Sequence, residues 1–360
     1  MTSIPVKRWT IESQKDDLSG LEYGDGALES NLGPDDVLVE MRTGSINYRD
    51  LVIAKGKLSQ VSKPGVIPGS DGAGIVVQAG ANAAFAPGDR VVTFLCPEKF
   101  SDPSLAEVDD TTLPRMPHIS ASLGQGVNGT MTTRGVFPQS CLAKIGDAIS
   151  FEEAATLSCS GITAWNALMG LRGREIKEGD WLLIQGTGGV SVAAMQFALA
   201  VGATVVATTS SERKAEKLRA LGAHHVINYK ETPNWGSAAR DLTPSKRGFD
   251  MIVDVGGQST MGESLAAIRT DGVIVSAGLL GSSEESPDIM NVLGSVCIVR
   301  GVLLGTRQMM RDMVTFIEGK GIKMAFDDEK VFALREYQDA LKRLEENKHF
   351  AKVLIKISEN

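Results

Sequence analysis

Cysteine is scarce in this chain of 360 residues and follows no pattern. The cysteines form no CxxC pair, and long stretches separate Cys96, Cys141, Cys159 and Cys297. Disulfide frameworks and cysteine-rich zinc sites both need cysteines at short, repeated spacings. The sequence therefore supports neither, and it predicts reduced thiols in a reducing compartment.

Long apolar runs are also missing. No run approaches the roughly 20 residues that cross a bilayer. The first 20 residues carry Lys7, Arg8, Lys15 and three acidic residues, where a secretory signal would be apolar. Hydrophobic residues make up 42% and charged residues 22% of the chain, close to globular averages. We expect a soluble, cytoplasmic protein that has no membrane partner.

Charge of one sign is not concentrated anywhere. The net charge is -7, with 37 basic and 44 acidic residues mixed along the chain. Nucleic-acid-binding proteins gather their lysines and arginines into a patch or stripe, which this sequence lacks. His118, His224 and His225 have no cysteine or carboxylate partner at ligand spacing. We predict no nucleic-acid partner and no histidine-based metal site.

The length and the glycine content point toward a two-domain, ligand-binding protein. A chain of 360 residues exceeds the size at which a single core keeps growing, so two domains are expected. Glycine occurs 39 times without a repeat period. This excess predicts tight turns, and places where the backbone must approach a ligand closely.

The two parts of the chain have different patterns. The first third contains β-forming segments at 36–46, 72–77 and 90–94, bounded by glycine and Pro-Gly-Asp turns. No element is predicted for 97–133, a polar stretch that contains Pro103, Pro114 and Pro117.

From about residue 160 strands alternate with helices, as in a parallel sheet covered on both faces. The predicted helices are 191–201, 212–221 and 261–268. The predicted strands are 181–185, 204–209, 225–229, 249–255, 272–277 and 297–303. Six strands complete a doubly wound sheet, so the tail, with helices at 307–319 and 334–347 and a strand at 352–357, is expected to rejoin the first domain. The fold class is α/β.

A glycine-rich turn is the sharpest local motif. The apolar segment that ends at Gln185 is followed by Gly186, Thr187, Gly188, Gly189 and Val190 and then by an apolar helix. Glycines at such a turn let backbone amides reach a pyrophosphate at the positive end of the helix. The third glycine of the usual motif is replaced by Ser191. An ordinary strand-to-helix turn is the alternative, but the strands that follow favour dinucleotide binding.

The next strand indicates which dinucleotide binds. No Asp or Glu stands at its end, where an NAD-preferring fold places a carboxylate against the ribose. Ser210 can hydrogen-bond there, and Lys214 can neutralise a 2′-phosphate. A solvated helix start is the alternative, and it is favoured for Arg213. We predict NADP, bound as NADPH.

Several motifs together resemble the medium-chain dehydrogenase/reductase superfamily over nearly the whole chain. They are GSINYRD at 44–50, PGSDGAG at 68–74, PGDRV at 87–91, the glycine turn, LGA at 221–223 with VINY at 226–229, and HFAK at 349–352. The resemblance implies a mostly-β, GroES-like catalytic domain, residues 1–158 and 306–360. It further implies a Rossmann domain, residues 159–305, with the nicotinamide in the cleft, and a homodimer formed through the sixth Rossmann strand.

The resemblance also gives a test for metal. In zinc alcohol dehydrogenases a Cys, a Gly-His-Glu and a later Cys surround the catalytic zinc. The matching positions here are Asn47, Ser70 with Asp71, and Cys159. Zinc catalysis needs about three protein ligands of N or S type plus an open position, so Cys159 alone cannot build the site. We predict no metal, as in the zinc-free branch that includes quinone oxidoreductases and enone reductases.

By resemblance, Asn47 and Tyr48 line the catalytic pocket. The same resemblance implies further cofactor contacts, namely Thr163, Tyr229, Gly256, Gly278, Leu279 and Lys352. Alternatives remain for some residues: Tyr48 can be an ordinary half-buried aromatic, Asp50 can cap nearby amides, and Cys159 can be a small buried hydrophobe.

The functional hypothesis is an enzyme that delivers hydride from NADPH to a quinone, enone or other α,β-unsaturated carbonyl compound. The Tyr48 hydroxyl, helped by the Asn47 amide, is the predicted donor where oxygen charge develops. Two alternatives stay open. One is an enoyl-thioester reductase or another tailoring reductase of a biosynthetic pathway, and the other is an NADPH-binding or sensor protein with little turnover.

Overall fold

The computed structural model describes residues 3–58, 62–278 and 287–358. The chain divides into two compact units. The first unit combines Met1–Ile162 with Thr306–Asn360, and the second is Thr163–Gly305. The tail therefore returns to the first unit, because strand β15 (Val353–Lys356) pairs antiparallel with β3 (Asp36–Ile46).

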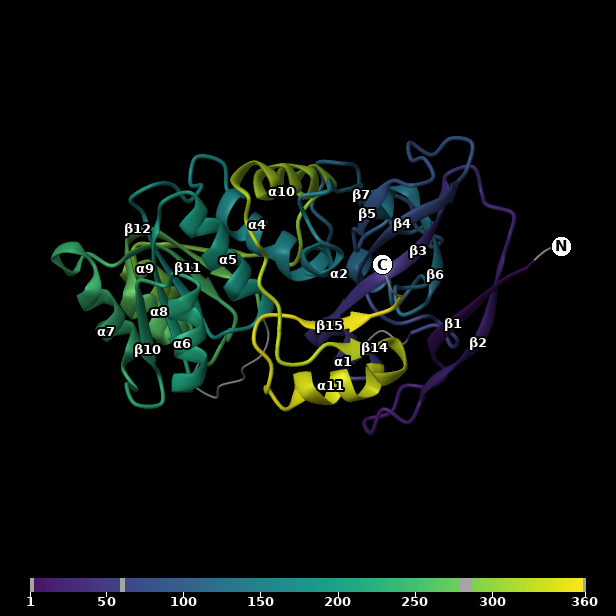
Figure 1. The fold of residues 1–360 in the computed structure, drawn as a ribbon. Helices are drawn as coiled ribbons and strands as arrows, with labels where there is room; N and C mark the ends of the chain where they lie inside the picture. Colours follow the sequence, from purple (N-terminus) through teal and green to yellow (C-terminus); the bar gives the residue numbers. More distant parts are fainter. Residues whose placement is uncertain (1–2, 59–61, 279–286, 359–360) are drawn as a thin grey trace. The chain divides into compact units, whose positions relative to one another are not determined.

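The first unit is mostly β (Figure 1). In its described residues, a seven-stranded sheet runs in the order β14-β15-β3-β4-β5-β7, with β6 also paired to β3. Strands β1 and β2 form a separate antiparallel hairpin. Their bounds are β1 Ser3–Ile11, β2 Leu21–Glu29, β4 Asp71–Ala79, β5 Arg90–Thr93, β6 Arg134–Pro138, β7 Leu142–Lys144 and β14 Phe332–Ala333.

Short helices close the first unit around an apolar core. Trp9, Ile46, Tyr337 and Ile355 belong to one buried cluster, which joins the hairpin, β3, β15 and α11. The helices are α1 Tyr48–Ala54, α2 Met116–Ser120, α3 Phe151–Ala154, α10 Arg307–Lys320 and α11 Tyr337–Glu345. The segment 97–133, for which the sequence predicts no element, thus contains one short helix.

The second unit is a doubly wound sheet, as predicted. Its described strands are all parallel and follow the order β10-β9-β8-β11-β12-β13. Their bounds are β8 Trp181–Gln185, β9 Thr204–Thr209, β10 His225–Asn228, β11 Phe249–Asp254, β12 Ile268–Ser276 and β13 Ile298–Gly301. The central strands β8 and β11 are mostly apolar because helices cover both faces of the sheet. The predicted α/β fold class is confirmed.

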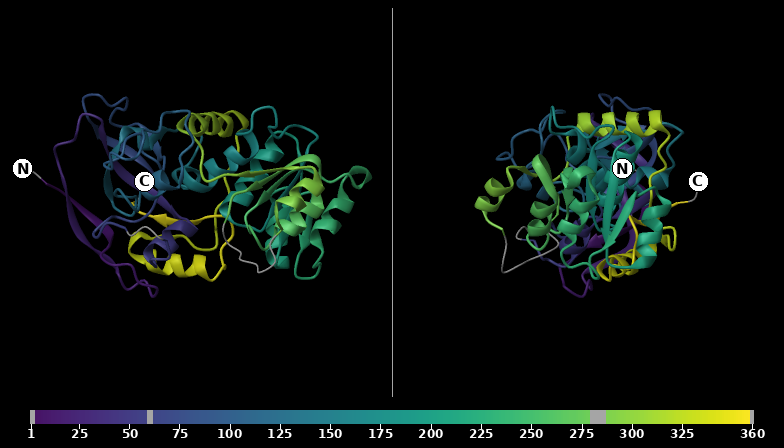
Figure 2. Two further views of the ribbon diagram at one scale, coloured as in Figure 1. Left: turned by 180° about the vertical axis from the view of Figure 1, so that it is seen from behind. Right: turned by 90° about the vertical axis from the view of Figure 1, so that its left-hand side faces the viewer.

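Helices flank this sheet on both sides (Figure 2). One face is covered by α7 and α8, whose Trp235, Ala239 and Ala267 pack in one cluster with Leu183 and Ile252 of the sheet. The helices are α4 Ile162–Met169, α5 Gly189–Ala200, α6 Glu212–Ala220, α7 Trp235–Leu242, α8 Met261–Ala267 and α9 Ile289–Ser295. The sequence predicts neither α7 nor α9, and it starts β12 four residues too late.

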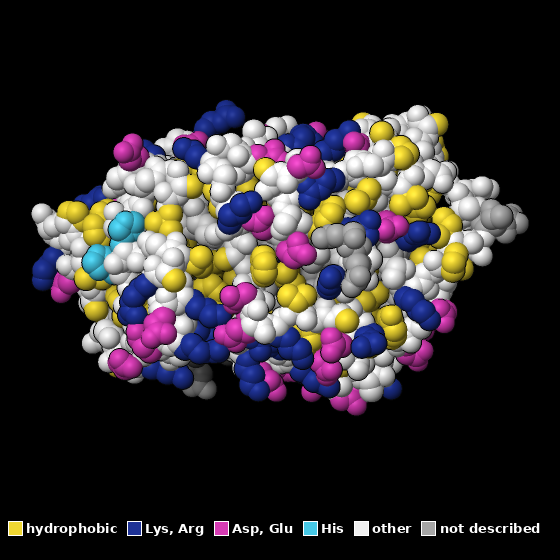
Figure 3. Space-filling view, in the orientation of Figure 1, with side chains coloured by type: hydrophobic (Ala, Val, Ile, Leu, Met, Phe, Trp, Pro, Cys, Tyr) yellow, Lys and Arg dark blue, Asp and Glu magenta, His cyan; other side chains and the backbone are white. Residues whose placement is uncertain are grey.

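On the face drawn in Figure 3, basic and acidic side chains are interspersed and form no large patch of one sign. Among the described residues, no helix has both the length and the apolar character that a membrane span requires.

Candidate functional site

The first group of candidate residues lies where β3 passes into α1. Asn47 is the N-cap residue of α1, yet its side chain makes no capping hydrogen bond. Asp50 takes this task, since its Oδ2 accepts the Asn47 backbone N–H at 2.8 Å. The structural role considered for Asp50 is therefore confirmed. Burial is the main cause that raises the pKa of the Asp50 carboxyl above its ordinary value.

The Asn47 carboxamide instead faces a buried lysine. Lys352, 3% exposed, donates from Nζ to the Ile46 carbonyl at 2.8 Å and to Asn47 Oδ1 at 2.5 Å. The same ammonium lies 3.0 Å from Oδ2 of Asp71, a fully buried carboxylate at the start of β4. The antiparallel register brings this about, because Val353 lies opposite Ile46. Three acceptors match the three N–H groups of an ammonium.

These contacts fix the orientation of the Asn47 amide. An ammonium has no acceptor, so the Asn47 atom that faces Lys352 must be the oxygen. Ser160 Oγ donates to the same oxygen at 3.3 Å. The opposite atom, Asn47 Nδ2, is buried without a hydrogen-bond partner among the described residues, as is Asp71 Oδ1. Buried polar atoms without partners are rare and call for a ligand or water.

The positions that match zinc ligands do not fit zinc. Ser70 is a hydroxyl and donates to Asp50 Oδ1 at 3.2 Å. Burial raises the pKa of the Cys159 thiol to about 12, so a metal would first have to displace its proton. The Asp71 carboxylate forms an ion pair with Lys352. A metal ion bound about 4 Å from that ammonium would be repelled by about 4 kcal/mol for each unit of its charge. Among the described residues, no group of three His, Cys, Asp or Glu side chains could hold a metal.

Tyr48, the second predicted catalytic residue, begins α1 and is 50% exposed. This exposure is also compatible with the alternative considered above, an ordinary half-buried aromatic. Its ring is adjacent in sequence to the Asn47 amide but is not part of the lysine cluster. About half of the Tyr48 surface is therefore open to a ligand.

The glycine turn lies in the second unit, between β8 and α5. Gly186 has a φ of +71°, a conformation that favours glycine. Gly188 has an ordinary φ of -79°, and a Cβ added there, or at Gly186, would meet no protein atom within 4 Å. Neither backbone strain nor packing explains Gly188. Open space in front of the α5 amides, which have no side-chain cap, fits a diphosphate group.

The replacement of the third glycine also has a local reason. Ser191 is buried, and its Oγ donates to the Gln185 carbonyl at 2.6 Å, tying the first turn of α5 to the end of β8. Thr187 is buried within the turn, whereas Gly189 and Val190 are half-buried at the start of α5. The glycines of the turn are thus partly exposed, while Thr187 and Ser191 pack inward.

The residues predicted to read the 2′-phosphate come together at the ends of β9 and β10. Tyr229 donates its backbone N–H to the Thr209 carbonyl at 3.0 Å, which places it beside Ser210. Lys214 is half-buried in the first turn of α6, where its backbone N–H is capped by Ser211. The acid in this turn, Glu212, forms an ion pair with Arg219.

Other predicted cofactor residues occupy separate places in the second unit. Thr163 is buried in α4, and its hydroxyl lies 3.5 Å from the Leu303 carbonyl. Gly256 follows β11 and Gly278 follows β12, both half-buried at the carboxyl edge of the sheet. In parallel sheets this edge carries the ligand site. Leu279 lies outside the described residues.

Sequence reasoning missed a buried carboxylate behind the glycine turn. Asp254, fully buried at the end of β11, accepts from Gln185 Nε2 at 3.0 Å and from Ser264 Oγ and Thr260 Oγ1, each at 2.7 Å. The Gly257 backbone N–H adds a bond of 2.8 Å. This network holds the ends of β8 and β11 together. The available signal was an aspartate directly after the apolar residues Met251, Ile252 and Val253.

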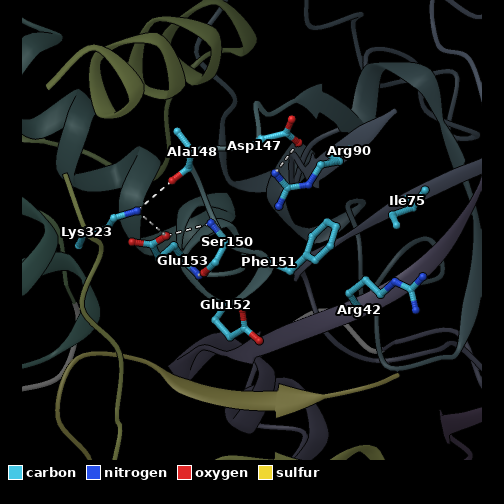
Figure 4. Close-up of a pocket in the computed structure, with 10 residues that line it drawn as sticks. All are labelled: Arg42, Ile75, Arg90, Asp147, Ala148, Ser150, Phe151, Glu152, Glu153 and Lys323. Atoms are coloured by element: carbon cyan, nitrogen blue, oxygen red, sulfur yellow. Dashed lines mark hydrogen bonds and ion pairs between the residues drawn. The ribbon is translucent and has the colours of Figure 1, made fainter. Parts of the chain in front are cut away.

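A hollow of about 380 Å³ in the first unit is not part of either group. Its cations face internal partners: Arg90 donates to the Gly146 and Ile149 carbonyls and stacks over the Phe151 ring, and Lys323 contacts Ala148 and Glu153 (Figure 4). None of its lining residues is a predicted site residue. We assign no function to it.

Two family models match the chain. Residues 33–151 match the alcohol dehydrogenase GroES-like domain, and residues 189–319 match the zinc-binding dehydrogenase family. The first falls in the mostly-β unit, and the second covers most of the doubly wound sheet and the start of the tail.

Individual proteins agree with these matches. A zinc-type alcohol dehydrogenase-like protein of Schizosaccharomyces pombe is 37% identical, over 97% of this chain and 99% of its own length. A crystal structure described as an alcohol dehydrogenase from Sinorhizobium meliloti has a TM-score of 0.86 and 30% identity, covering 99% of this chain and 100% of that one. A crotonyl-CoA reductase of Streptomyces collinus is 30% identical over 68% of this chain and 61% of its own length.

Proposed function

Because this chain belongs to the medium-chain dehydrogenase/reductase superfamily and is an oxidoreductase, we propose that it reduces a conjugated carbonyl compound with NADPH and without zinc. The substrate class is a quinone, an enone or another α,β-unsaturated carbonyl. The observation that carries the proposal is the buried Lys352 ammonium, held by Asn47 and Asp71 at the positions that match zinc ligands.

The second unit would hold the cofactor. The open face of Gly186 and Gly188 and the uncapped amides of α5 suit its diphosphate. Ser210, Lys214 and Tyr229 gather where the 2′-phosphate of NADPH would be recognised, and no carboxylate ends β9. Thr163, Gly256, Gly278, Leu279 and Lys352 were further candidates by resemblance. Lys352 has its three donors already engaged, which favours another role for it.

When bound, NADPH supplies the hydride, and the protein must stabilise the negative charge that develops on the carbonyl oxygen. Two donors are available in the first unit. The Asn47 Nδ2 group has no hydrogen-bond partner within the part of the chain that the structure describes, and Tyr48 is half exposed. Tyr48 or water then supplies the proton. Conjugated carbonyls suit such a site because delocalisation makes them more electrophilic than simple ketones.

A reductase of enoyl thioesters is the second candidate. It uses the same hydride chemistry, and the similarity to a crotonyl-CoA reductase supports it. An NADPH-binding protein with little turnover remains the alternative of another class. Turnover itself separates that alternative from both enzymes.

We also propose that the protein forms a homodimer through the β13 edge. Helix α9 and its C-cap residue directly precede β13 in the chain, and they expose Ile289, Met290, Leu293 and Val296, each between 60% and 74%. An exposed apolar face of this kind beside an unpaired strand edge is typical of a subunit interface.

An acceptor screen tests the proposal. The purified protein is incubated with NADPH or NADH and with quinones, enones, alkenals, enoyl thioesters, and saturated aldehydes as the matched control. We expect oxidation of NADPH with the conjugated acceptors and much slower oxidation with the saturated aldehydes. Preferential turnover of simple alcohols and aldehydes with NAD(H) would contradict the proposal, and NADPH binding without turnover on any acceptor would favour the sensor.

A further inference from the structure

We propose that Lys352 is a positioning residue that acts through Asn47: it fixes the carboxamide so that Asn47 Nδ2 donates to the carbonyl oxygen of the substrate. The ammonium thereby supplies the positive charge that a catalytic metal would supply, but it acts on the substrate through the Asn47 side chain. This inference rests on the proposed function, since it assumes a conjugated carbonyl substrate.

Lys352 cannot serve the substrate directly. Its three N–H groups are engaged by Ile46 O, Asn47 Oδ1 and Asp71 Oδ2. An ammonium has no further donor and no acceptor. A contact between Lys352 and a ligand would require one of these buried bonds to break. Its influence on a substrate must therefore pass through one of its partners.

Asn47 is the partner through which Lys352 can influence the substrate. Its Oδ1 accepts from the ammonium, so its Nδ2 must point away from Lys352, and this atom is buried without a partner among the described residues. A charge-assisted bond to the oxygen draws electron density out of the amide and makes the N–H group a stronger donor. Asn47 is free for this task because Asp50 caps α1 in its place.

The surroundings make the arrangement rigid. Lys352 and Asp71 are 3% and 0% exposed, and both are attached to paired strands, β15 and β4. Preorganised donors of this kind need not reorganise during the reaction, which is why they are effective. Hydride transfer would break a C–H bond of NADPH and form one at the β-carbon of the substrate, while the C=C electrons shift to the carbonyl oxygen beside Asn47 Nδ2. A proton from Tyr48 or water would then bind at the α-carbon, which leaves the reduced substrate and NADP⁺.

A double-mutant cycle tests the inference. Asn47→Ala should lower kcat about 100-fold, the typical cost of removing one such donor. Lys352→Met should lower kcat at least tenfold, with NADPH affinity within about threefold of wild type. The variant with both changes should be no slower than Asn47→Ala alone, because Lys352 acts through Asn47. Three results would each overturn the inference. They are an unchanged kcat in Lys352→Met, the same loss of kcat when Lys352→Met is added to Asn47→Ala, and a loss of NADPH affinity.

A second design keeps the test valid if Lys352→Met does not fold, because this change leaves the Asp71 carboxylate buried and unpaired. Combining it with Asp71→Asn removes both charges, and the same cycle is then run against Asn47→Ala on the Asp71→Asn background.

NMR adds a readout without turnover. The side-chain amide signals that Asn47→Ala removes should be shifted in wild type and should move toward free-amide values when Lys352 is replaced. No movement would overturn the inference, whereas absent turnover in wild type with movement would refute only the proposed substrate class.

Discussion

The ammonium of Lys352 and the side-chain oxygen of Asn47 are hydrogen-bonded in the buried part of the first unit, although 305 positions separate them in the chain. This bond joins the C-terminal strand β15 to the start of α1. It accounts for the unused cap of α1, and it leaves Asn47 Nδ2 without a hydrogen-bond partner among the described residues.

Replacing Tyr48 by Phe should lower kcat about tenfold or more, because the phenol is the second proposed donor to the substrate oxygen. NADPH affinity should stay nearly unchanged, since Tyr48 lies outside the unit that carries the glycine turn. Steady-state kinetics and a binding titration measure both. Tyr23→Phe, at a similarly exposed tyrosine of the hairpin, is the control. An unchanged rate removes Tyr48 from this role.

Gly188→Ala should weaken NADPH binding at least about tenfold, or 1.4 kcal/mol, without changing the thermal stability of the free protein. The reason is that the added methyl group meets no protein atom and would take the space of the diphosphate. Calorimetric titration and thermal melting check this. Gly319→Ala in α10, also without neighbours, is the control and should leave binding intact. Full affinity in Gly188→Ala would show that the turn does not hold the cofactor.

Lys214→Ala should raise the dissociation constant for NADPH about tenfold and leave that for NADH unchanged, since only NADPH offers a 2′-phosphate. Fluorescence titration with both cofactors gives the ratio. The neighbouring Arg213→Ala serves as the control and should alter neither constant. Equal losses for the two cofactors would mean that Lys214 supports the fold of α6 and does not read the phosphate.

Leu293→Glu should convert a dimer into a monomer, because it places a charge in the exposed apolar face of α9, where Leu293 is 65% exposed. Analytical ultracentrifugation measures the mass. Val331→Glu, at an exposed apolar position of the first unit, should leave the mass unchanged. If wild type is already monomeric at micromolar concentration, the proposed interface is wrong.

The sequence was informative wherever local pattern decides structure. Strand β3 has the predicted bounds, and β8 and β9 do as well, because glycine or polar turns bracket their apolar runs. The hairpin β1–β2 was missed because β2 is largely exposed and carries no apolar alternation. Helix α9 was missed for a related reason: its apolar residues face outward, so they show no pattern of a buried stripe.

The candidate site was predictable as a set of residues but not as a set of contacts. Asn47 and Lys352 were both singled out, one for the substrate and one for the cofactor. That they touch follows from the antiparallel register of β15 on β3, in which Val353 lies opposite Ile46. Strand pairing over such a separation depends on the whole sheet, and no local motif encodes it.

Metal content measured on active enzyme tests the central claim most directly. Elemental analysis of purified protein that oxidises NADPH with a conjugated acceptor, before and after treatment with a chelator, gives the zinc content per chain alongside the rate. We expect far less than one zinc per chain and an unchanged rate after chelation. One zinc per chain, removed together with the activity and restored with it, would show that the enzyme depends on zinc.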